Sequence, residues 1–187
     1  MRVPPKHFGL LALAAGAIVL LVAVLFSPDV ASGRSARVSA PPPCRTSQLV
    51  VWLDTMGNGV AGGAYYKLEF TNSGPSACSL YGYPGVSALS VYGGQLGAAA
   101  VREHVHPLNR ITLASDRSVT ARRTTAVALL RITDAGVYGR SQCRQRLAVG
   151  LRVYPPDQRV SKTVPFPFRA CARTEPHVLT IQPVTAR

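Results

Sequence analysis

A long apolar run near the start of the chain is the first feature of its hydrophobic pattern. Residues 8–26 (FGLLALAAGAIVLLVAVLF) contain no charged residue, no proline and no hydrogen-bonding side chain. As a helix rising about 1.5 Å per residue, this run spans about 28 Å, close to the hydrocarbon thickness of a bilayer. Arg2 and Lys6 precede it, so the positive-inside rule keeps residues 1–7 in the cytoplasm. We expect a single-pass transmembrane helix that places the following residues outside the plasma membrane.

A lipid anchor and a cleaved signal peptide are the alternatives to a transmembrane anchor for this segment. A lipoprotein needs a cysteine soon after the apolar run, but the first one is Cys44. A cleaved signal peptide needs small residues just past the run, and residues 30–32 (VAS) offer such a site. The run exceeds the usual signal core of about 7–15 residues, which favours an uncleaved anchor and leaves secretion as the alternative. Residues 27–43, small, polar and ended by three prolines, then predict an extracytoplasmic tether.

From Cys44 onward the apolar pattern alternates, as in half-buried strands. Residues 64–71 place Tyr66, Leu68 and Phe70 on one face and polar residues, Glu69 among them, on the other. No later stretch sustains a helical stripe over ten residues. Short strands separated by Gly, Pro, Asn and Ser clusters are typical of an antiparallel β-sandwich.

A second alternating segment, residues 147–153, predicts an inward stripe of Leu147, Val149, Leu151 and Val153. Further strands are expected at residues 48–55, 86–92, 111–113, 125–133, 164–169 and 179–182. Residues 59–63 (GVAGG) lie between two predicted strands and indicate a hairpin tip. The expected fold class is all-β: one immunoglobulin-like antiparallel sandwich over residues 44–187, preceded by the transmembrane helix.

The four cysteines predict disulfides if the domain lies outside the membrane. Four cysteines allow three pairings, of which we expect the nearest in sequence, Cys44–Cys78 and Cys143–Cys171. Each bridge would close a loop worth roughly 3.5–4 kcal/mol in the chain-entropy description. A zinc site is the competing interpretation, but the sequence has no C-x-x-C spacing.

Residues 72–86 (NSGPSACSLYGYPGV) carry a recognisable motif, in which a strand ends in Asn-x-Gly before a cysteine and then Leu-x-Gly-Tyr-Pro-Gly-Val. With Cys44 opening the domain and a late pair, Cys143 and Cys171, the motif resembles the actinobacterial domain of unknown function DUF4232. The likeness covers about residues 44–184. It implies an exported or lipid-anchored envelope protein with one β-sandwich-like domain, and it implies no catalytic residue. The cysteine to which a lipid would be attached is missing after the apolar run. We therefore expect an anchor helix or secretion in place of a lipid anchor.

The same motif has a structural and a functional interpretation. Gly82 and Gly85 flank a Tyr-Pro pair, which is typical of a turn because proline fixes φ and glycine accepts positive φ. This favours a structural corner. The functional alternative is a rim of Tyr81, Tyr83 and Tyr92 that binds a sugar or a lipid headgroup.

The charge balance adds a binding hypothesis. Lys+Arg number 21 and Asp+Glu 8, for a formal net charge of +13. One arginine group comprises Arg117, Arg122, Arg123 and Arg131, and a second comprises Arg140, Arg144, Arg146 and Arg152. On a strand, Arg144, Arg146 and Arg152 would share the face opposite the Leu147–Val153 stripe. Outside a membrane such a face attracts anionic lipid, acidic envelope polymer or an acidic protein, whereas nucleic acid is not expected there. The alternative is a solvated basic surface.

Residues 103–106 (EHVH) are the one segment that suggests a metal. On a strand His104 and His106 point to the same side, as a two-histidine clamp requires, and His177 could be a third ligand. The alternative, which we favour, is a pair of partly exposed histidines before a turn at Pro107. We therefore expect no metal and no cofactor.

Catalytic patterns are weak in this sequence. Gly139-Arg140-Ser141 lacks the second glycine of a nucleophile elbow, and the carboxylates are scattered singly along the chain. No glycine-rich phosphate loop precedes a helix. We expect a non-catalytic, membrane-anchored binding module of the cell envelope. The alternatives are a cell-wall hydrolase with a dispersed site and a metal-handling domain using His104 and His106.

Overall fold

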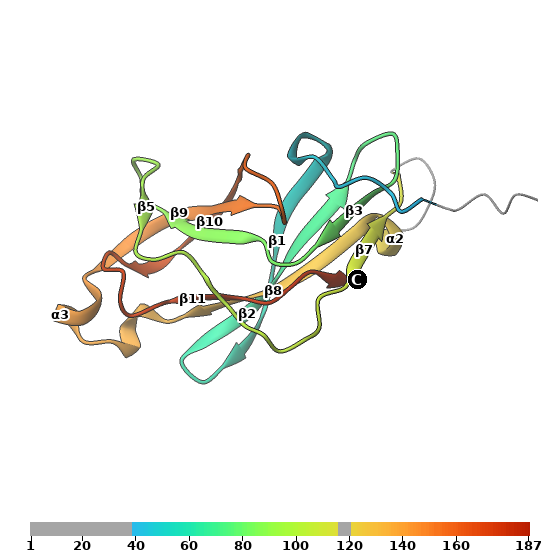
Figure 1. Cartoon of the computed structure of the whole chain (residues 1–187). Coiled ribbons are helices and arrows are strands. Elements are labelled where there is room, and N and C mark those ends of the chain that lie inside the picture. Colours follow the sequence, from blue (N-terminus) through green and yellow to red (C-terminus); the bar gives the residue numbers. More distant parts are fainter. Residues whose placement is uncertain (1–38, 116–120) are drawn as a thin grey trace, which may run out of the picture. The chain divides into compact units, whose positions relative to one another are not determined.

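The computed structural model describes residues 39–115 and 121–187 (Figure 1). The predicted cytoplasmic segment 1–7, the transmembrane helix 8–26 and most of the tether 27–43 lie outside the described residues. Among the residues that are described, no helix is long and apolar enough to cross a membrane.

The described part of the chain is mostly β-structure, as the alternating pattern predicts. The strands are β1 (Leu49–Val60), β2 (Gly63–Asn72), β3 (Cys78–Tyr81), β4 (Gly85–Leu89), β5 (Gln95–Leu96), β6 (Val101–Arg102), β7 (Arg110–Leu113), β8 (Thr125–Thr133), β9 (Gln145–Tyr154), β10 (Lys162–Cys171), β11 (Leu179–Ile181) and β12 (Thr185–Ala186). The helical elements are short: η1 (Thr46–Gln48), α2 (Ala121–Thr124), η2 (Ala135–Val137) and α3 (Arg140–Cys143).

The strands form two larger sheets and one small one. The first has the order β1-β2-β8-β11-β6, with β12 also paired to β8. The second has the order β10-β9-β4-β5, and β3 pairs with β7 in the third. Almost all neighbours are antiparallel, but β6 runs parallel to β11, with Thr180 opposite Val101. The fully antiparallel arrangement expected from the sequence is therefore wrong at this edge.

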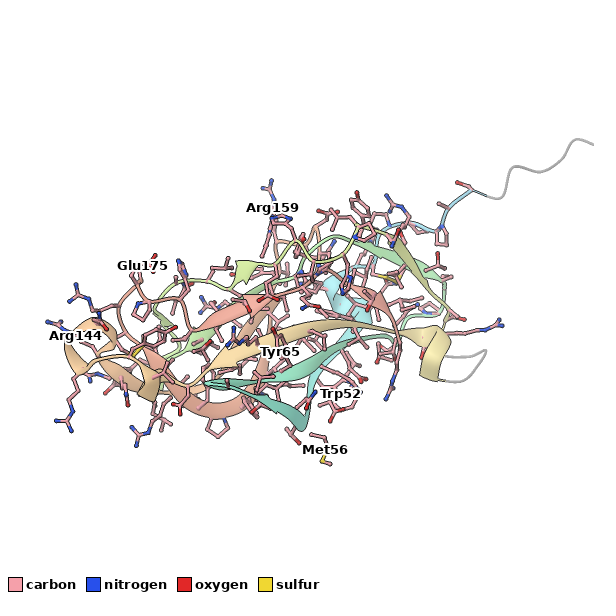
Figure 2. The ribbon with its side chains drawn as sticks, turned by 90° about the horizontal axis from the view of Figure 1, so that it is seen from below. Trp52, Met56, Tyr65, Arg144, Arg159 and Glu175 are labelled. Atoms are coloured by element: carbon pink, nitrogen blue, oxygen red, sulfur yellow. A yellow bond between two sulfur atoms is a disulfide. The ribbon has the colours of Figure 1, made fainter. Side chains whose placement is uncertain are left out.

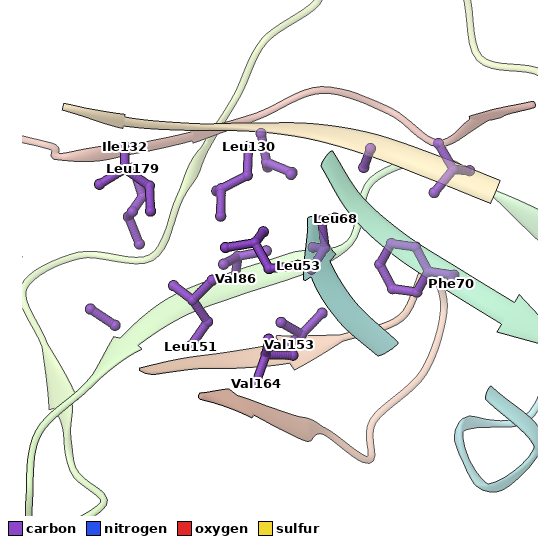
Figure 3. Packing of buried hydrophobic residues seen from close by; sticks show 14 of the residues in the cluster. Leu53, Leu68, Phe70, Val86, Leu130, Ile132, Leu151, Val153, Val164 and Leu179 are labelled. Carbon is purple, nitrogen blue, oxygen red and sulfur yellow. The ribbon is translucent and has the colours of Figure 1, made fainter. Parts of the chain in front are cut away.

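The core lies between the two larger sheets, as Figure 3 shows. Leu68 and Leu130 point inward from the first sheet and Leu151, Val153 and Val164 from the second, and all five are buried. Full burial of such a side chain contributes about 1.5–3 kcal/mol. The packing of these two apolar layers against each other is the main interaction that stabilises the described domain.

The hairpin of β1 and β2 follows the sequence prediction closely. Its two-residue turn lies at the expected glycine-rich tip, where Gly62 has φ of +72°. Leu68 and Phe70 are fully buried, as predicted for the inward face of β2. On the opposite face, however, Glu69 is only 1% exposed, although the pattern predicted a solvated position.

The inward stripe predicted for residues 147–153 is wrong in its first half. Leu147 is 56% exposed and Val149 is 38% exposed, whereas the second half of the stripe is buried. The pairing of β9 with β10 shifts by one residue at this point. At Gly150 a Cβ atom would lie 2.4 Å from the carbonyl oxygen of Val164, so the strand approaches β10 there without a side chain. The face of β9 that points toward the core therefore changes at this irregularity.

Both predicted disulfides are confirmed. Cys44 is bonded to Cys78 with a Cα–Cα distance of 4.8 Å, and Cys143 to Cys171 with 4.6 Å. The first bridge ties the start of the domain to β3. The second ties the end of α3 to the end of β10.

The domain includes the last prolines of the predicted tether. The Ser79 backbone N–H donates to the Pro42 carbonyl at 2.8 Å, and the Ser79 hydroxyl donates to the Pro41 carbonyl at 3.0 Å. Pro43 also forms an isolated parallel bridge with Ser79. The described chain thus begins beside β3, at the end of the domain opposite to α3 (Figures 1 and 2).

Candidate functional site

The α3 end of the domain is held by several bonds between distant parts of the chain. The Ala172 N–H donates to the carbonyl oxygens of Cys143 and Arg144, both at 3.1 Å. The Gln145 side-chain amide donates to the Ala135 carbonyl at 3.0 Å. Together with the Cys143–Cys171 disulfide, these bonds fix the end of α3 against the end of β10 and the start of β9 against η2. The backbone that carries the side chains of α3 is therefore held in place.

A basic cavity of about 400 Å³ opens at this end, lined by Arg140, Arg144, Gln145 and Arg146. Arg140 and Arg144 are four residues apart, which brings them to the same side of a helical turn. No carboxylate is part of the lining. Within residues 39–115 and 121–187, no ion pair joins any of the three arginines to an acidic side chain. We call this the basic cavity.

A second cavity of about 490 Å³ also borders α3, where Gln142 lies about 200° around the helical turn from Arg140. It is lined by Tyr138, Ser141, Gln142, Arg173, Glu175 and Pro176. Its lining combines an aromatic ring, a hydroxyl, an amide, a guanidinium and a carboxylate, so both donors and acceptors are present. Figure 2 shows Arg144 and Glu175 at the same end of the domain. We call this the mixed cavity.

The structure does not bring together the three arginines that the sequence placed on one strand face. Arg144 is the left-handed residue after α3, with φ of 49°, and lies before β9 begins. Arg146 lies near the start of β9, whereas Arg152 is six residues further on, or about 20 Å at about 3.3 Å per residue. Arg152 donates to the Gly93 carbonyl at 2.7 Å. Arg140, which the sequence grouped with them, takes its place beside Arg144 and Arg146.

The other predicted arginine group is dispersed. Arg131 lies over the ring of Tyr65, with its Cζ atom 6.0 Å from the centroid, and Arg123 is exposed after the undescribed segment. Arg117 and the side chain of Arg122 lie outside the described part of the chain. No common surface of this group is therefore described.

The three tyrosines of the motif do not form one rim. Tyr81 has Arg110 over its ring at 5.4 Å. The Tyr83 hydroxyl makes a hydrogen bond of 3.1 Å with His104 Nδ1. Tyr92 is 95% exposed in the turn beyond the far end of β4. The corner itself is confirmed, since the glycine after β3, Gly82, has φ of +94°.

The geometry of a two-histidine clamp is not formed. β6 ends at Arg102, so His104 and His106 lie outside any strand. The nearby Glu103 carboxylate accepts hydrogen bonds from the Thr180 hydroxyl at 2.8 Å and from the Gln182 amide at 3.1 Å. In the described ranges no group of three His, Cys, Asp or Glu residues is placed to hold a metal ion.

Glu69 is a buried titratable group that the sequence pattern did not reveal. Arg187 Nη1 lies 3.4 Å from its Oε2 atom, and Trp52 is its direct partner across β1 and β2. Burial raises the pKa of this carboxyl, and Asp54 raises it further, while Arg187 and Lys67 act in the opposite direction. Glu69 lines neither the basic cavity nor the mixed cavity. Its position indicates a structural ion pair rather than a reacting group.

Comparison with known proteins identifies a family but no activity. The profile of a family described as a domain of unknown function, DUF4232, matches residues 44–185. No curated protein and no solved structure matches the chain. The matched range begins at Cys44 and contains both disulfides and both cavities at the α3 end.

Proposed function

The chain belongs to the DUF4232 family, and from this premise we propose that it is a non-catalytic binding module of the cell envelope. In this proposal residues 8–26 anchor it in the plasma membrane as a single-pass helix, with secretion after cleavage as the alternative. The domain, an immunoglobulin-like sandwich in this proposal, then lies outside the membrane. Two disulfides support this location, because such bonds persist in oxidising, extracytoplasmic compartments.

The binding surface is the basic cavity at the α3 end. The observation that carries this proposal is that Arg140, Arg144 and Arg146 line one cavity without a carboxylate among them. Three guanidinium groups held close together repel one another unless an anion lies between them. Guanidinium groups also form paired hydrogen bonds with phosphate and carboxylate oxygens. The ligand is therefore an anion-bearing envelope component, whose charged groups come from an acidic polymer or from lipid headgroups.

The test compares two variants that lose the same charge. R140Q/R144Q/R146Q empties the basic cavity of guanidinium groups and leaves shorter, uncharged polar side chains. R45Q/R123Q/R159Q removes three exposed arginines elsewhere, and Arg159 and Arg144 are well separated in Figure 2. The full chain is purified in a neutral detergent under oxidising conditions, and its affinity for immobilised poly(glycerol phosphate) is measured.

We expect the cavity variant to bind about tenfold or more weakly than the unaltered chain, because it loses several charge-assisted contacts. The control variant should retain most of the affinity. Raising the salt from about 0.15 M to about 1 M shortens the screening length from about 8 Å to about 3 Å and should weaken binding strongly. Equal affinities of the two variants, or binding that ignores salt, would refute the proposal.

A further inference from the structure

We infer that the ligand of the α3 end is an anionic polysaccharide, with its charged groups in the basic cavity and a sugar ring in the mixed cavity. This inference rests on the proposed function and names the class of ligand that the same site takes. The two cavities share the segment 138–146 in their linings. α3 gives Arg140 to the basic cavity and Ser141 and Gln142 to the mixed cavity.

The lining of the mixed cavity suits a hydroxyl-rich ligand better than a bare anion. Oε1 of Glu175 lies 2.9 Å from His177 Nε2, and the other carboxylate oxygen can accept from a donor on the ligand. That carboxylate repels a phosphate but accepts a hydrogen bond from a sugar hydroxyl. The Gln142 Oε1 atom accepts from the Gly139 N–H at 3.3 Å, which leaves the amide hydrogens free to donate. The charges of the two linings therefore favour anion contacts in the basic cavity and sugar contacts in the mixed cavity.

Tyr138 supplies the apolar surface that a sugar ring requires. Its ring is part of the mixed cavity and is half-buried against the core. An amphipathic ring of this kind packs against the C–H face of a ligand while polar neighbours fix its orientation. Pro176, also part of the lining, adds a second apolar surface. A headgroup phosphate has no corresponding apolar face.

The size of the site favours a chain over a single small anion. The mixed cavity alone, at about 490 Å³, falls within the range of about 300–1,000 Å³ that is usual for small-ligand sites. A helical turn with its side chains is about 10–12 Å across. A ligand that occupies both cavities must bridge α3, which requires at least two linked units.

The experiment separates the sugar contact from the anion contact. The full chain in neutral detergent is titrated with polygalacturonate, with inorganic polyphosphate of similar charge, and with glycerophosphoglycerol, the water-soluble headgroup of phosphatidylglycerol. Y138A and Q142A alter the mixed cavity, and R140Q/R144Q/R146Q alters the basic one. Y92A, at a tyrosine that is 95% exposed and lines neither cavity, is the matched aromatic control. Thermal unfolding confirms that each variant is folded, and Q142A covers the case in which Y138A is not.

We expect Y138A and Q142A to weaken polygalacturonate binding about fivefold or more while polyphosphate binding stays unchanged. The arginine variant should weaken binding to both, and Y92A to neither. The inference is overturned if the mixed-cavity variants match the unaltered chain on polygalacturonate, if they weaken polyphosphate binding equally, or if the lipid headgroup binds more tightly than the polysaccharide. If the arginine variant binds every probe as the unaltered chain does, the proposed function itself fails.

Discussion

At the scale of single residues, Glu69 is a buried carboxylate without a hydrogen-bond partner among the described residues. Its side chain is 1% exposed, and within the described residues neither carboxylate oxygen accepts a hydrogen bond. The guanidinium of Arg187, at 3.4 Å, partly offsets the charge. Because burial disfavours the ionised form, the pKa of Glu69 is raised from its ordinary value of 4.5. The folded state therefore binds a proton at Glu69 more tightly than the unfolded chain does.

This raised pKa predicts a stability difference that depends on pH. Wherever the folded state binds more protons, the free energy of unfolding falls as the pH rises. The contribution of Glu69 should therefore decrease as the pH rises from 4.5 through the raised pKa. Urea unfolding of the unaltered chain and of E69Q at a series of pH values measures it as a difference.

Glu175, whose side chain is 75% exposed, provides the control for this measurement. E175Q removes one carboxylate but keeps Glu69, so its free energy of unfolding should fall over the same pH range as that of the unaltered chain does. A difference between the unaltered chain and E69Q that stays constant, or that grows with pH, would contradict the assignment.

Glu69 and Arg144 show where local patterns stop being informative. The alternation in β2 placed Glu69 on the correct face, but the side chain is buried there and its ion-pair partner is Arg187, a residue distant in sequence. Arg144 was assigned to a strand, whereas the chain turns there through a left-handed conformation. A non-glycine residue in that conformation has no strong local signal. Both errors concern tertiary context rather than residue chemistry.

At the scale of elements, the α3 end depends on its connections rather than on helix propensity. α3 has four residues, far fewer than an isolated helix needs to be stable. The Cys143–Cys171 disulfide and the bonds from Ala172 hold it to the end of β10. The arrangement of the two cavities should therefore depend on this bridge, whereas the Cys44–Cys78 bridge lies beside β3 at the other end.

The two bridges predict variants with similar stability and different binding. Both close loops of similar length, with separations of 28 and 34 residues. Removing either one should cost about 3.5–4 kcal/mol of unfolding free energy in the chain-entropy description. C143S/C171S should also lose affinity for poly(glycerol phosphate), and C44S/C78S should keep it at temperatures where both are folded. Equal loss of affinity in the two variants would show that the bridge does not organise the cavities.

The positions of the strands along the chain were largely predictable from the sequence. Which face of each strand points toward the core was less predictable. The β1–β2 hairpin follows from one clear alternation and one glycine turn, both of which are local. In β9 the apolar residues alternate without a break, yet Leu147 is exposed because the pairing with β10 shifts beside Gly150. A register shift belongs to the partner strand as much as to the strand itself. The sequence of one strand alone therefore cannot specify the register shift.

At the scale of the whole molecule, composition and cysteine spacing were the informative features. The even cysteine count and the nearest pairing gave the correct bridges. The basic balance indicated an anion-binding surface, and the structure gathers Arg140, Arg144 and Arg146 at one end. The mixed cavity was not predicted, because Tyr138, Gln142 and Glu175 come together only through the packing of α3 and the segment after β10.

The proposed location predicts a specific labelling pattern on intact cells. A membrane-impermeant amine reagent should modify the domain without cell lysis, since Lys67 is exposed. Alkylation without reductant should modify no cysteine, and alkylation after denaturation and reduction should modify four. Mass spectrometry of the full chain reads both results. Labelling that requires lysis, or thiols that react without reduction, would place the domain in a reducing compartment.

The place of Trp52 has a practical consequence for spectroscopy. It is the single tryptophan of the chain, it is 40% exposed, and it lies across from Glu69 on the face turned away from the core. Indole emission from the native protein therefore originates at one known point. That point belongs to the β1–β2 hairpin and is well separated from Arg144 at the α3 end (Figure 2), so a change of indole emission with acid follows the hairpin that carries Glu69 rather than the two cavities.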